Sequence, residues 1–315
     1  MTPVDGIITV DTEYARPLQD ASHLLIEQGR AAFVDTGVSA SVPLLLAALE
    51  RHDIDVAAVD YVFLTHVHLD HAGGAGLLMR QLPNARCVIH PRGAPHMIDP
   101  EKVIAGTEAV YGKEVTRTLY GEVLPIPAGR IDIADDGEWF HLAGRALQAF
   151  YTEGHARHHY CLYDPASKSV FTGDSFGVSY RELDTAAGAF IFPTTTPVNF
   201  DPVEAHKSVD RVLSYEPAQV FLTHYSGVGQ PSALGRDLHA GIDDYVEMAV
   251  ALKDAPNRSE ALHSALLNYY VSRLRQHGYA GGRDAIGRLL ELDVTLNTKG
   301  LEVWLDRQNQ GGING

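Results

Sequence analysis

The chain has 315 residues, of which 45% are hydrophobic and 21% charged, a composition typical of a globular protein with one large domain and an extension. Its net charge of −15 disfavours a nucleic-acid partner, because an acidic surface repels phosphate backbones. No stretch reaches the ~18 apolar residues of a membrane span. The N-terminal segment has no basic region followed by an apolar run. We therefore expect a cytoplasmic protein without a membrane or nucleic-acid partner.

The first third of the chain alternates short apolar runs with amphipathic segments. The runs predict strands and the amphipathic segments predict helices, in the order strands 7–10, 23–27 and 31–34, helix 42–52, strand 59–64, helix 77–82 and strand 86–90. Residues 92–125 carry scattered proline, glycine and aromatic residues, and we expect them to be irregular. The two cysteines, Cys87 and Cys161, lie inside apolar runs, which predicts buried thiols in a reducing compartment.

The remainder of the chain returns to strands and then becomes helical. Strands are predicted over residues 138–142, 146–151, 160–163, 169–172 and 219–223, with an irregular span over 176–200. Residues 232–305 have a largely helical pattern. Strands followed by helices in both halves indicate sheets covered by helices. We predict an α/β domain over residues 1–230 and an α-helical C-terminal extension over residues 231–315.

The most informative segment directly follows the predicted strand 59–64. After Thr65 it places His66, His68, Asp70 and His71 within six positions. Imidazole nitrogens and carboxylate oxygens are the ligands that zinc, iron and manganese accept. A turn between a strand and a helix is where α/β proteins build sites on a rigid scaffold. The spacing therefore predicts a metal site at the end of this strand.

Ligand-type residues also follow three other predicted strands. His155 comes after the strand that ends at Tyr151, Asp174 follows strand 169–172 across a glycine, and His224 ends the strand over 219–223. A single HxHxDH segment does not complete a metal site, whereas the same feature at four strand ends predicts that these residues converge.

These motifs together resemble the metallo-β-lactamase-fold superfamily. The resemblance rests on Asp35-Thr36-Gly37, the HxHxDH segment that starts at His66, Gly154-His155, Gly173-Asp174 and Thr223-His224, in that order. It covers about residues 20–226 and is nearest to the glyoxalase II and lactonase-like branch. It implies an αββα metallo-β-lactamase sandwich, with residues 1–230 as the catalytic domain.

The resemblance also implies a role for each matched residue. It assigns His66, His68 and His155 to a first metal and Asp70, His71 and His224 to a second metal, with Asp174 bridging the two. Asp70 would also orient the attacking water as the catalytic base. Asp35 would support the ligands from behind, and His159 would lie near the site without binding metal. The cofactors expected are two divalent metal ions, zinc first, with iron or manganese as alternatives.

Hydrolysis is the reaction that such a site predicts. A metal-bound hydroxide would attack a small ester, thioester or lactone. An iron-dependent redox enzyme, either a persulfide dioxygenase or a diiron oxygen-handling protein, is the alternative; the diiron branch usually has a glutamate where this chain has His68. A non-catalytic metal-binding protein is a third possibility.

The partner expected is a small-molecule substrate, and the helical extension is a candidate homodimer surface. Aromatic side chains in the two irregular spans and beside His224 are the candidate substrate-binding residues, because ligand pockets are mostly apolar with a few placed polar groups. They are Tyr111, Tyr180, Phe192 and Tyr225.

Overall fold

The computed structural model describes residues 6–195, 197 and 200–311. By its internal contacts the chain divides into two compact units. The first unit consists of Met1–Tyr151, His158–Gly173 and Val212–Pro231. The second consists of Thr152–Arg157, Asp174–Arg211 and Ser232–Gly315.

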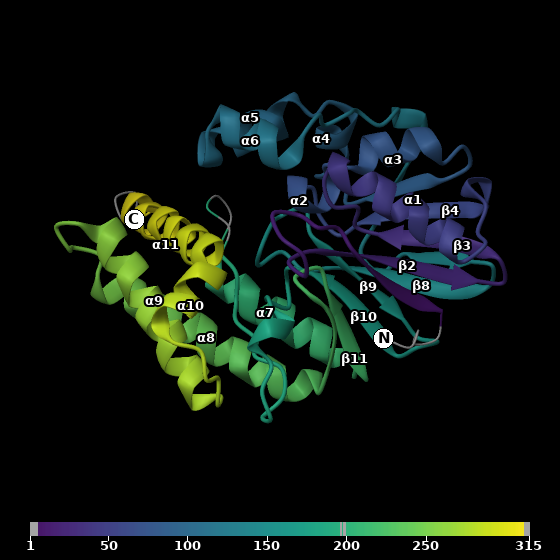
Figure 1. Ribbon diagram of the computed structural model, residues 1–315. Helices are drawn as coiled ribbons and strands as arrows, with labels where there is room; N and C mark the ends of the chain where they lie inside the picture. The colour runs from purple at the N-terminus through teal and green to yellow at the C-terminus, as the bar shows by residue number, and fades with distance from the viewer. Residues whose placement is uncertain (1–5, 196, 198–199, 312–315) are drawn as a thin grey trace. The chain divides into compact units, whose positions relative to one another are not determined.

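The first unit contains two six-stranded mixed sheets (Figure 1). The first sheet has the order β1-β2-β3-β4-β5-β6, with strands Ile7–Asp11, Ala21–Glu27, Arg30–Val34, Val59–Leu64, Arg86–Ile89 and Ile131–Ile133. The second sheet has the order β12-β11-β10-β9-β8-β7. Its strands in chain order from β7 are Trp139–Leu142, Arg145–Tyr151, Tyr160–Asp164, Ser169–Gly173, Gln219–Leu222 and Ser226–Gly229. The predicted α/β sandwich with C-terminal helices is confirmed.

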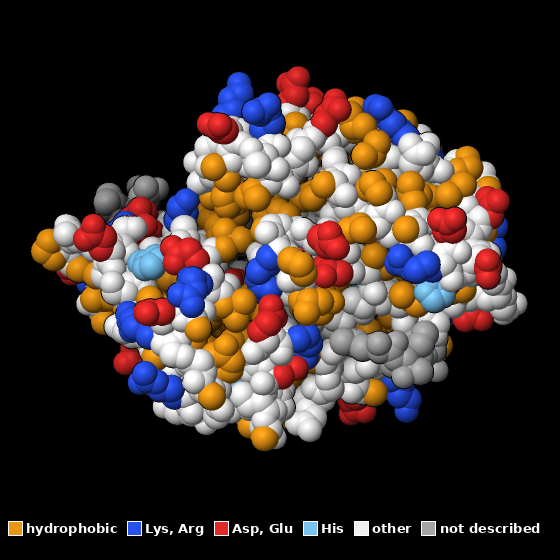
Figure 2. Space-filling view, viewed as in Figure 1, with side chains coloured by type: hydrophobic (Ala, Val, Ile, Leu, Met, Phe, Trp, Pro, Cys, Tyr) orange, Lys and Arg blue, Asp and Glu red, His pale blue; other side chains and the backbone are white. Residues whose placement is uncertain are grey.

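Charged side chains of both signs are interspersed on the face shown in Figure 2. Several basic side chains pair with carboxylates, such as Arg30 with Asp60 and Arg86 with Asp132. Partly exposed pairs of this kind contribute only about 0–1 kcal/mol to stability. Their main effect is to neutralise charge locally.

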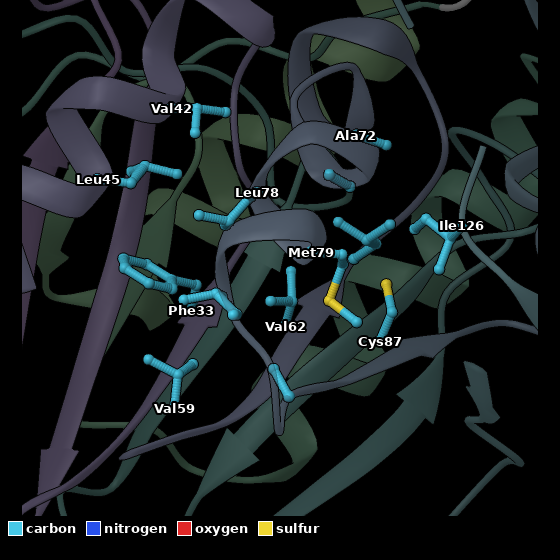
Figure 3. Close-up of a cluster of buried hydrophobic side chains, with 14 of the residues drawn as sticks. Phe33, Val42, Leu45, Val59, Val62, Ala72, Leu78, Met79, Cys87 and Ile126 are labelled. Atoms are coloured by element: carbon cyan, nitrogen blue, oxygen red, sulfur yellow. The ribbon is translucent and has the colours of Figure 1, made fainter. Parts of the chain in front are cut away.

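The carboxyl-terminal half of strand β4 is buried on both faces. In β4, Val62 and Leu64 pack in the core formed with helices α1 (Val42–Arg51) and α3 (Ala75–Gln81), as Figure 3 shows for Val62. Phe63, between them in sequence, points to the other side and packs in the core that residues of both sheets share. Successive side chains of a strand alternate between faces, so a continuous apolar run is what a doubly covered strand requires.

His23 on β2 is a buried polar exception in the region between the sheets. Its Nε2 atom lies 3.1 Å from the carbonyl oxygen of Leu222, and its ring contacts those of Phe171 and Phe221, which stack on each other. Burial lowers the pKa of His23 from 6.5 to about 4. The native protein therefore keeps this ring neutral at a pH at which the unfolded chain protonates it.

This difference predicts a pH-dependent loss of stability. Below pH 6.5 the unfolded state binds a proton that the native state does not, so the free energy of unfolding falls as the pH is lowered toward 4. Between pH 7 and pH 5 His23 should account for about 2 kcal/mol of this loss. The free energy of unfolding is measured with denaturant at both pH values, in the wild type and in His23→Gln. Its decrease from pH 7 to pH 5 should be about 2 kcal/mol smaller in the variant. Equal losses in the two proteins would contradict the assignment.

The prediction of an irregular span over 92–125 is wrong in its central part. Three helices occupy it: α4 (Ala94–Ile98), α5 (Glu101–Tyr111) and α6 (Lys113–Tyr120). Proline lies in the first turn of α4, where its missing N–H costs nothing. Gly112, with φ of 84°, separates α5 from α6. Pro95 and Gly112 therefore mark helix boundaries here rather than irregular structure.

The second unit is mainly helical in the part that the structure describes. Its helices are α7 (Pro202–Ser214), whose last turn belongs to the first unit, α8 (Pro231–Ala251), α9 (Arg258–Gln276), α10 (Arg283–Leu289) and α11 (Glu291–Gly311). Among the described helices, none is both long and apolar enough to cross a membrane. The predicted domain boundary after residue 230 stays a prediction.

Candidate metal centre

Parallel strand pairing brings the predicted residues of the first sheet to one edge. Strands β3 and β4 are parallel, so their carboxyl ends lie side by side. Asp35 follows β3 and donates its backbone N–H to Phe63 on β4. Thr65 and His66 follow β4, and the short helix α2 (Leu69–Ala72) then carries Asp70 and His71.

Five predicted ligands of the first unit form one cluster of imidazole and carboxylate groups. His66 Nε2 lies 2.8 Å from His68 Nδ1. The Oδ2 atom of Asp70 lies 3.9 Å from His71 Nε2 and 3.6 Å from His224 Nε2. Asp70, His71 and His224 can each direct one ligand atom to a common point. The ring centroids of His66 and His71 are 4.0 Å apart, which joins the two parts of the cluster.

The Nδ1 atoms of three of these rings face oxygen atoms on the side away from the cluster. His71 Nδ1 donates to Asp35 Oδ2 at 2.8 Å, and His224 Nδ1 donates to the carbonyl oxygen of Gln19 at 2.9 Å. His66 Nδ1 lies 3.2 Å from the hydroxyl of Thr65. Metal-binding histidines are usually held this way, because a proton on the outer nitrogen leaves the inner nitrogen as the ligand atom.

Asp35 is the centre of the supporting hydrogen bonds. It is fully buried, with a φ of 56°, a left-handed conformation that aspartate tolerates better than most residues. Its Oδ1 atom accepts from the backbone N–H of Thr65 at 2.8 Å. Its Oδ2 atom accepts at 2.8 Å each from the hydroxyls of Thr65 and Thr223 and from His71. Asp35 thus connects the ends of three strands to one of the clustered imidazoles.

His159 lies against the cluster, as expected of a residue near the site. It is buried, and its ring centroid is 4.9 Å from that of His66. Gly173, with φ of 47°, closes the space behind: a Cβ at this position would come within 2.6 Å of both His159 Nε2 and Thr65 Oγ1. Only glycine combines this backbone conformation with this close approach.

Asp20 is a buried acidic residue of the region that the sequence motifs did not reveal. It precedes β2, is fully buried and accepts a hydrogen bond from the hydroxyl of Thr12. Burial raises its pKa to about 7, while His224 and His71 act in the opposite direction. It matches no ligand motif; a carboxylate directly before a buried strand is the only signal that the sequence offers.

The second unit contains the two remaining predicted ligands. His155 Nε2 lies 3.4 Å from Asp174 Oδ2, and both residues are buried. Gly154 fixes the turn before His155, because a Cβ there would come within 2.3 Å of Ala205 on α7. Its backbone N–H donates to the hydroxyl of Ser208 on the same helix.

A small cavity adjoins this pair within the second unit. Its volume is about 20 Å³, sufficient for about one water molecule. Its lining combines polar residues, among them His155 and Asp174, with apolar side chains such as Phe200, Leu238 and Ile242.

The candidate ligand atoms suit divalent transition metals such as zinc. They consist of imidazole nitrogens and carboxylate oxygens, without thiolates, since Cys87 and Cys161 are buried free thiols inside strands β5 and β9. Zinc, iron and manganese all accept such ligands. The groups are candidate His/Asp metal-binding groups typical of a binuclear site in this kind of fold.

The four predicted substrate-binding aromatics occupy packed positions. Tyr111 ends α5 and contacts the ring of Tyr120. Tyr180 is buried and donates to Asp293 on α11, and Phe192 packs against Tyr270 on α9. Tyr225, next to His224, is 6% exposed. Their contact with a substrate stays a prediction.

Comparison with known proteins establishes the class. Residues 15–224 match the family model described as the metallo-beta-lactamase superfamily. The match covers more than half of the chain and includes the HxHxDH segment and the three later strand ends. The chain belongs to the metallo-beta-lactamase superfamily, which confirms the resemblance that the motifs indicated.

Several known proteins resemble the chain at low identity. It is 27% identical over 57% of its length to the metallo-beta-lactamase fold-containing protein ST1585 of Sulfurisphaera tokodaii, covering 65% of that protein. It is 25% identical over 68% of its length to a hydroxyacylglutathione hydrolase of Aeromonas hydrophila, covering 61% of it, and 27% identical over 49% to an atrochrysone carboxyl ACP thioesterase of Aspergillus fumigatus, covering 36%.

The matched stretch thus spans between about a third and two thirds of these relatives. The fold likeness extends further: the crystal structure of ST1585 from Sulfolobus tokodaii superposes with a TM-score of 0.64, at 21% identity, over 95% of this chain and 99% of that one.

Proposed function

We propose that this protein is a binuclear metal-dependent hydrolase that acts on a small ester, thioester or lactone. The observation that carries the proposal is the cluster of His66, His68, Asp70, His71 and His224, formed by residues that follow β4 of the first sheet and β11 of the second. Oxygen atoms face the outer nitrogens of three of its rings. Outer partners of this kind are typical of metal-binding histidines, because they fix the tautomer and the direction of the ring.

We propose a division of ligands that follows the order of the motifs. His66, His68 and His155 hold one ion, Asp70, His71 and His224 hold the other, and Asp174 bridges them. Asp174 and His224 follow β10 and β11, which are parallel and therefore end at the same edge of the second sheet. Zinc is the metal we expect first, because five of the six non-bridging ligands are histidines that bind it as neutral imidazoles.

The chain's own residues position the reactants. Two bound divalent ions would supply a water of lowered pKa and a Lewis acid for the carbonyl oxygen. Asp70, whose side chain is 23% exposed and is the carboxylate of the cluster, accepts a hydrogen bond from the attacking water and orients it. Asp35 and Thr65 keep the imidazoles in the required tautomer and direction.

A thioester is the substrate class that we place first. Two of the relatives are named as a hydroxyacylglutathione hydrolase and an ACP thioesterase, and acyl conjugates of glutathione and of a carrier protein are both thioesters. The family match over residues 15–224 includes the metal-ligand motifs, so the inference concerns the chemistry of the core. We expect a small-molecule substrate and no nucleic-acid partner, given the net charge of −15.

The proposal is tested with a panel of small thioesters, esters and lactones. We expect zinc-loaded protein to hydrolyse at least one class and Asp70→Asn to lower kcat by about 10²- to 10⁴-fold. His141→Ala, which changes an exposed histidine on β7, is the control and should retain activity. Metal content is measured on the same preparations to separate loss of the base from loss of metal. Full activity in Asp70→Asn, or no hydrolysis of any class, would contradict the proposal, and bound iron with a visible absorption band would favour the redox alternative.

A further inference from the structure

Helices α7 and α8 each carry a histidine followed four residues later by an aspartate. The pairs are His206 and Asp210 on α7, and His239 and Asp243 on α8. Residues four apart lie on the same face of a helix. All four side chains belong to the second unit, and none of them takes part in the proposed binuclear centre.

The two imidazoles of this group meet head to head. Their Nδ1 atoms are 2.6 Å apart, and the ring planes differ by 8° with centroids 4.9 Å apart. On the far side, His206 Nε2 lies 3.1 Å from Asp243 Oδ1, and His239 Nε2 lies 3.1 Å from Asp210 Oδ1. Each ring is thus held by the carboxylate of the opposite helix, giving the linear order Asp243, His206, His239, Asp210.

The protonation states follow from this order. A carboxylate only accepts hydrogen bonds when ionised, so each Nε2 atom carries its proton and donates. In a neutral imidazole the other nitrogen then has a lone pair. The two Nδ1 lone pairs then point at each other, and such an approach is favourable only with a proton or a metal ion between the nitrogens.

We expect a metal ion rather than a shared proton here, because a carboxylate holds each ring from behind and both rings are partly exposed. The arrangement of carboxylate, imidazole and open nitrogen is the one that holds metal-binding histidines in place. The side chains of His206 and His239 are 29% and 28% exposed, which leaves room for waters to complete the coordination. Tetrahedral zinc with bonds of about 2.0–2.1 Å needs the nitrogens about 3.4 Å apart. From the observed 2.6 Å, the side chains must separate slightly and the rings must turn so that both lone pairs converge on the ion.

We propose that His206 and His239 form a second, surface site for a zinc-like divalent cation, bound through their Nδ1 atoms. Asp210 and Asp243 hold the rings, and the ion links α7 to α8 (Figure 1). The site adjoins Ala205 and Ser208, the residues of α7 that contact Gly154 before His155. A bound ion would therefore stiffen the helix that supports this turn.

The test is the number of Zn²⁺ ions that the full chain binds in a calorimetric titration. We expect His206→Ala and His239→Ala each to bind one zinc fewer than the wild type. Asp210→Asn and Asp243→Asn should weaken that binding event by about 10- to 100-fold. His263→Ala, a partly exposed histidine of α9 near Glu291, is the matched control and should bind as the wild type does. Circular dichroism checks that each variant is folded.

The outcomes distinguish this site from the binuclear centre. Asp174→Ala should keep the zinc that His206 and His239 bind, even if it loses zinc from the proposed binuclear centre. An unchanged zinc count in both His206→Ala and His239→Ala would overturn the proposal. A loss of the same size in His263→Ala would also overturn it, since it would show non-specific binding to surface histidines.

Discussion

Replacing His71 with alanine is expected to remove the metal held by Asp70, His71 and His224 and to lower kcat/KM by more than about 100-fold. The loss of a supporting residue costs about 10- to 100-fold in metal affinity or activity, and the loss of a ligand should cost more. Both ring nitrogens of His71 have a partner: its Nδ1 atom donates to Asp35, and its Nε2 atom lies 3.9 Å from Asp70 Oδ2. Elemental analysis and kinetics on the same preparation measure both effects.

A matched control for this variant is His90→Ala. His90 is also buried and directly follows a strand of the first sheet, β5, as His66 follows β4. It belongs to none of the candidate metal groups of the described residues. We expect His90→Ala to lose stability and keep its metal. Equal metal content in His71→Ala and His90→Ala would show that His71 is not a ligand.

Replacing Asp35 with alanine should damage both stability and metal binding. The substitution leaves the hydroxyls of Thr65 and Thr223 and the Nδ1 atom of His71 without their buried acceptor. Removing one partner of a buried charged hydrogen-bonded group costs about 3–5 kcal/mol. The metal affinity should fall by about 10- to 100-fold, because His71 is no longer held in its tautomer. Denaturant unfolding and a competitive chelator titration measure the two quantities.

Asp164→Ala separates these effects. Asp164 is a fully buried carboxylate that pairs with Arg145 and accepts from Ser167. It lies at the end of β9 opposite to His159. The loss of stability should be similar to that of Asp35→Ala, without loss of metal affinity. If both variants lose metal equally, the loss in Asp35→Ala comes from general destabilisation. The prediction that the hydrogen bonds of Asp35 specifically support metal binding would then be wrong.

The local patterns of the sequence predicted the strands well because burial on both faces leaves a simple signal. Runs such as Val59–Leu64 are apolar at nearly every position, and short apolar runs of this kind are typical of buried strands. The span over 92–125 was harder, since proline and glycine occur at helix boundaries as well as in loops. The short strand β12 (Ser226–Gly229) has two glycines and was not predicted, because its pairing with β11 is a tertiary effect.

The candidate metal ligands could be predicted from the sequence. Histidine and aspartate are common metal ligands, and parallel strand pairing brings the strand ends that carry them together. The hydrogen bond from His224 to the carbonyl of Gln19 could not be foreseen, because backbone acceptors leave no mark in a sequence. Asp20 was missed for a related reason, since its position depends on the burial of β2. The symmetric pairs on α7 and α8 became visible only when the two helices were seen to meet.

The measurement that tests the central claim most directly is the metal content of the protein after dialysis against metal-free buffer. It is made on His206→Ala, so that the proposed surface site does not contribute, and on the same variant with Asp174→Ala added. We expect about two equivalents of zinc in the first protein and fewer than about one in the second, because a bridging carboxylate holds both ions. Full metal content in both proteins, or no tightly bound metal in the first, would contradict a binuclear centre built from these residues.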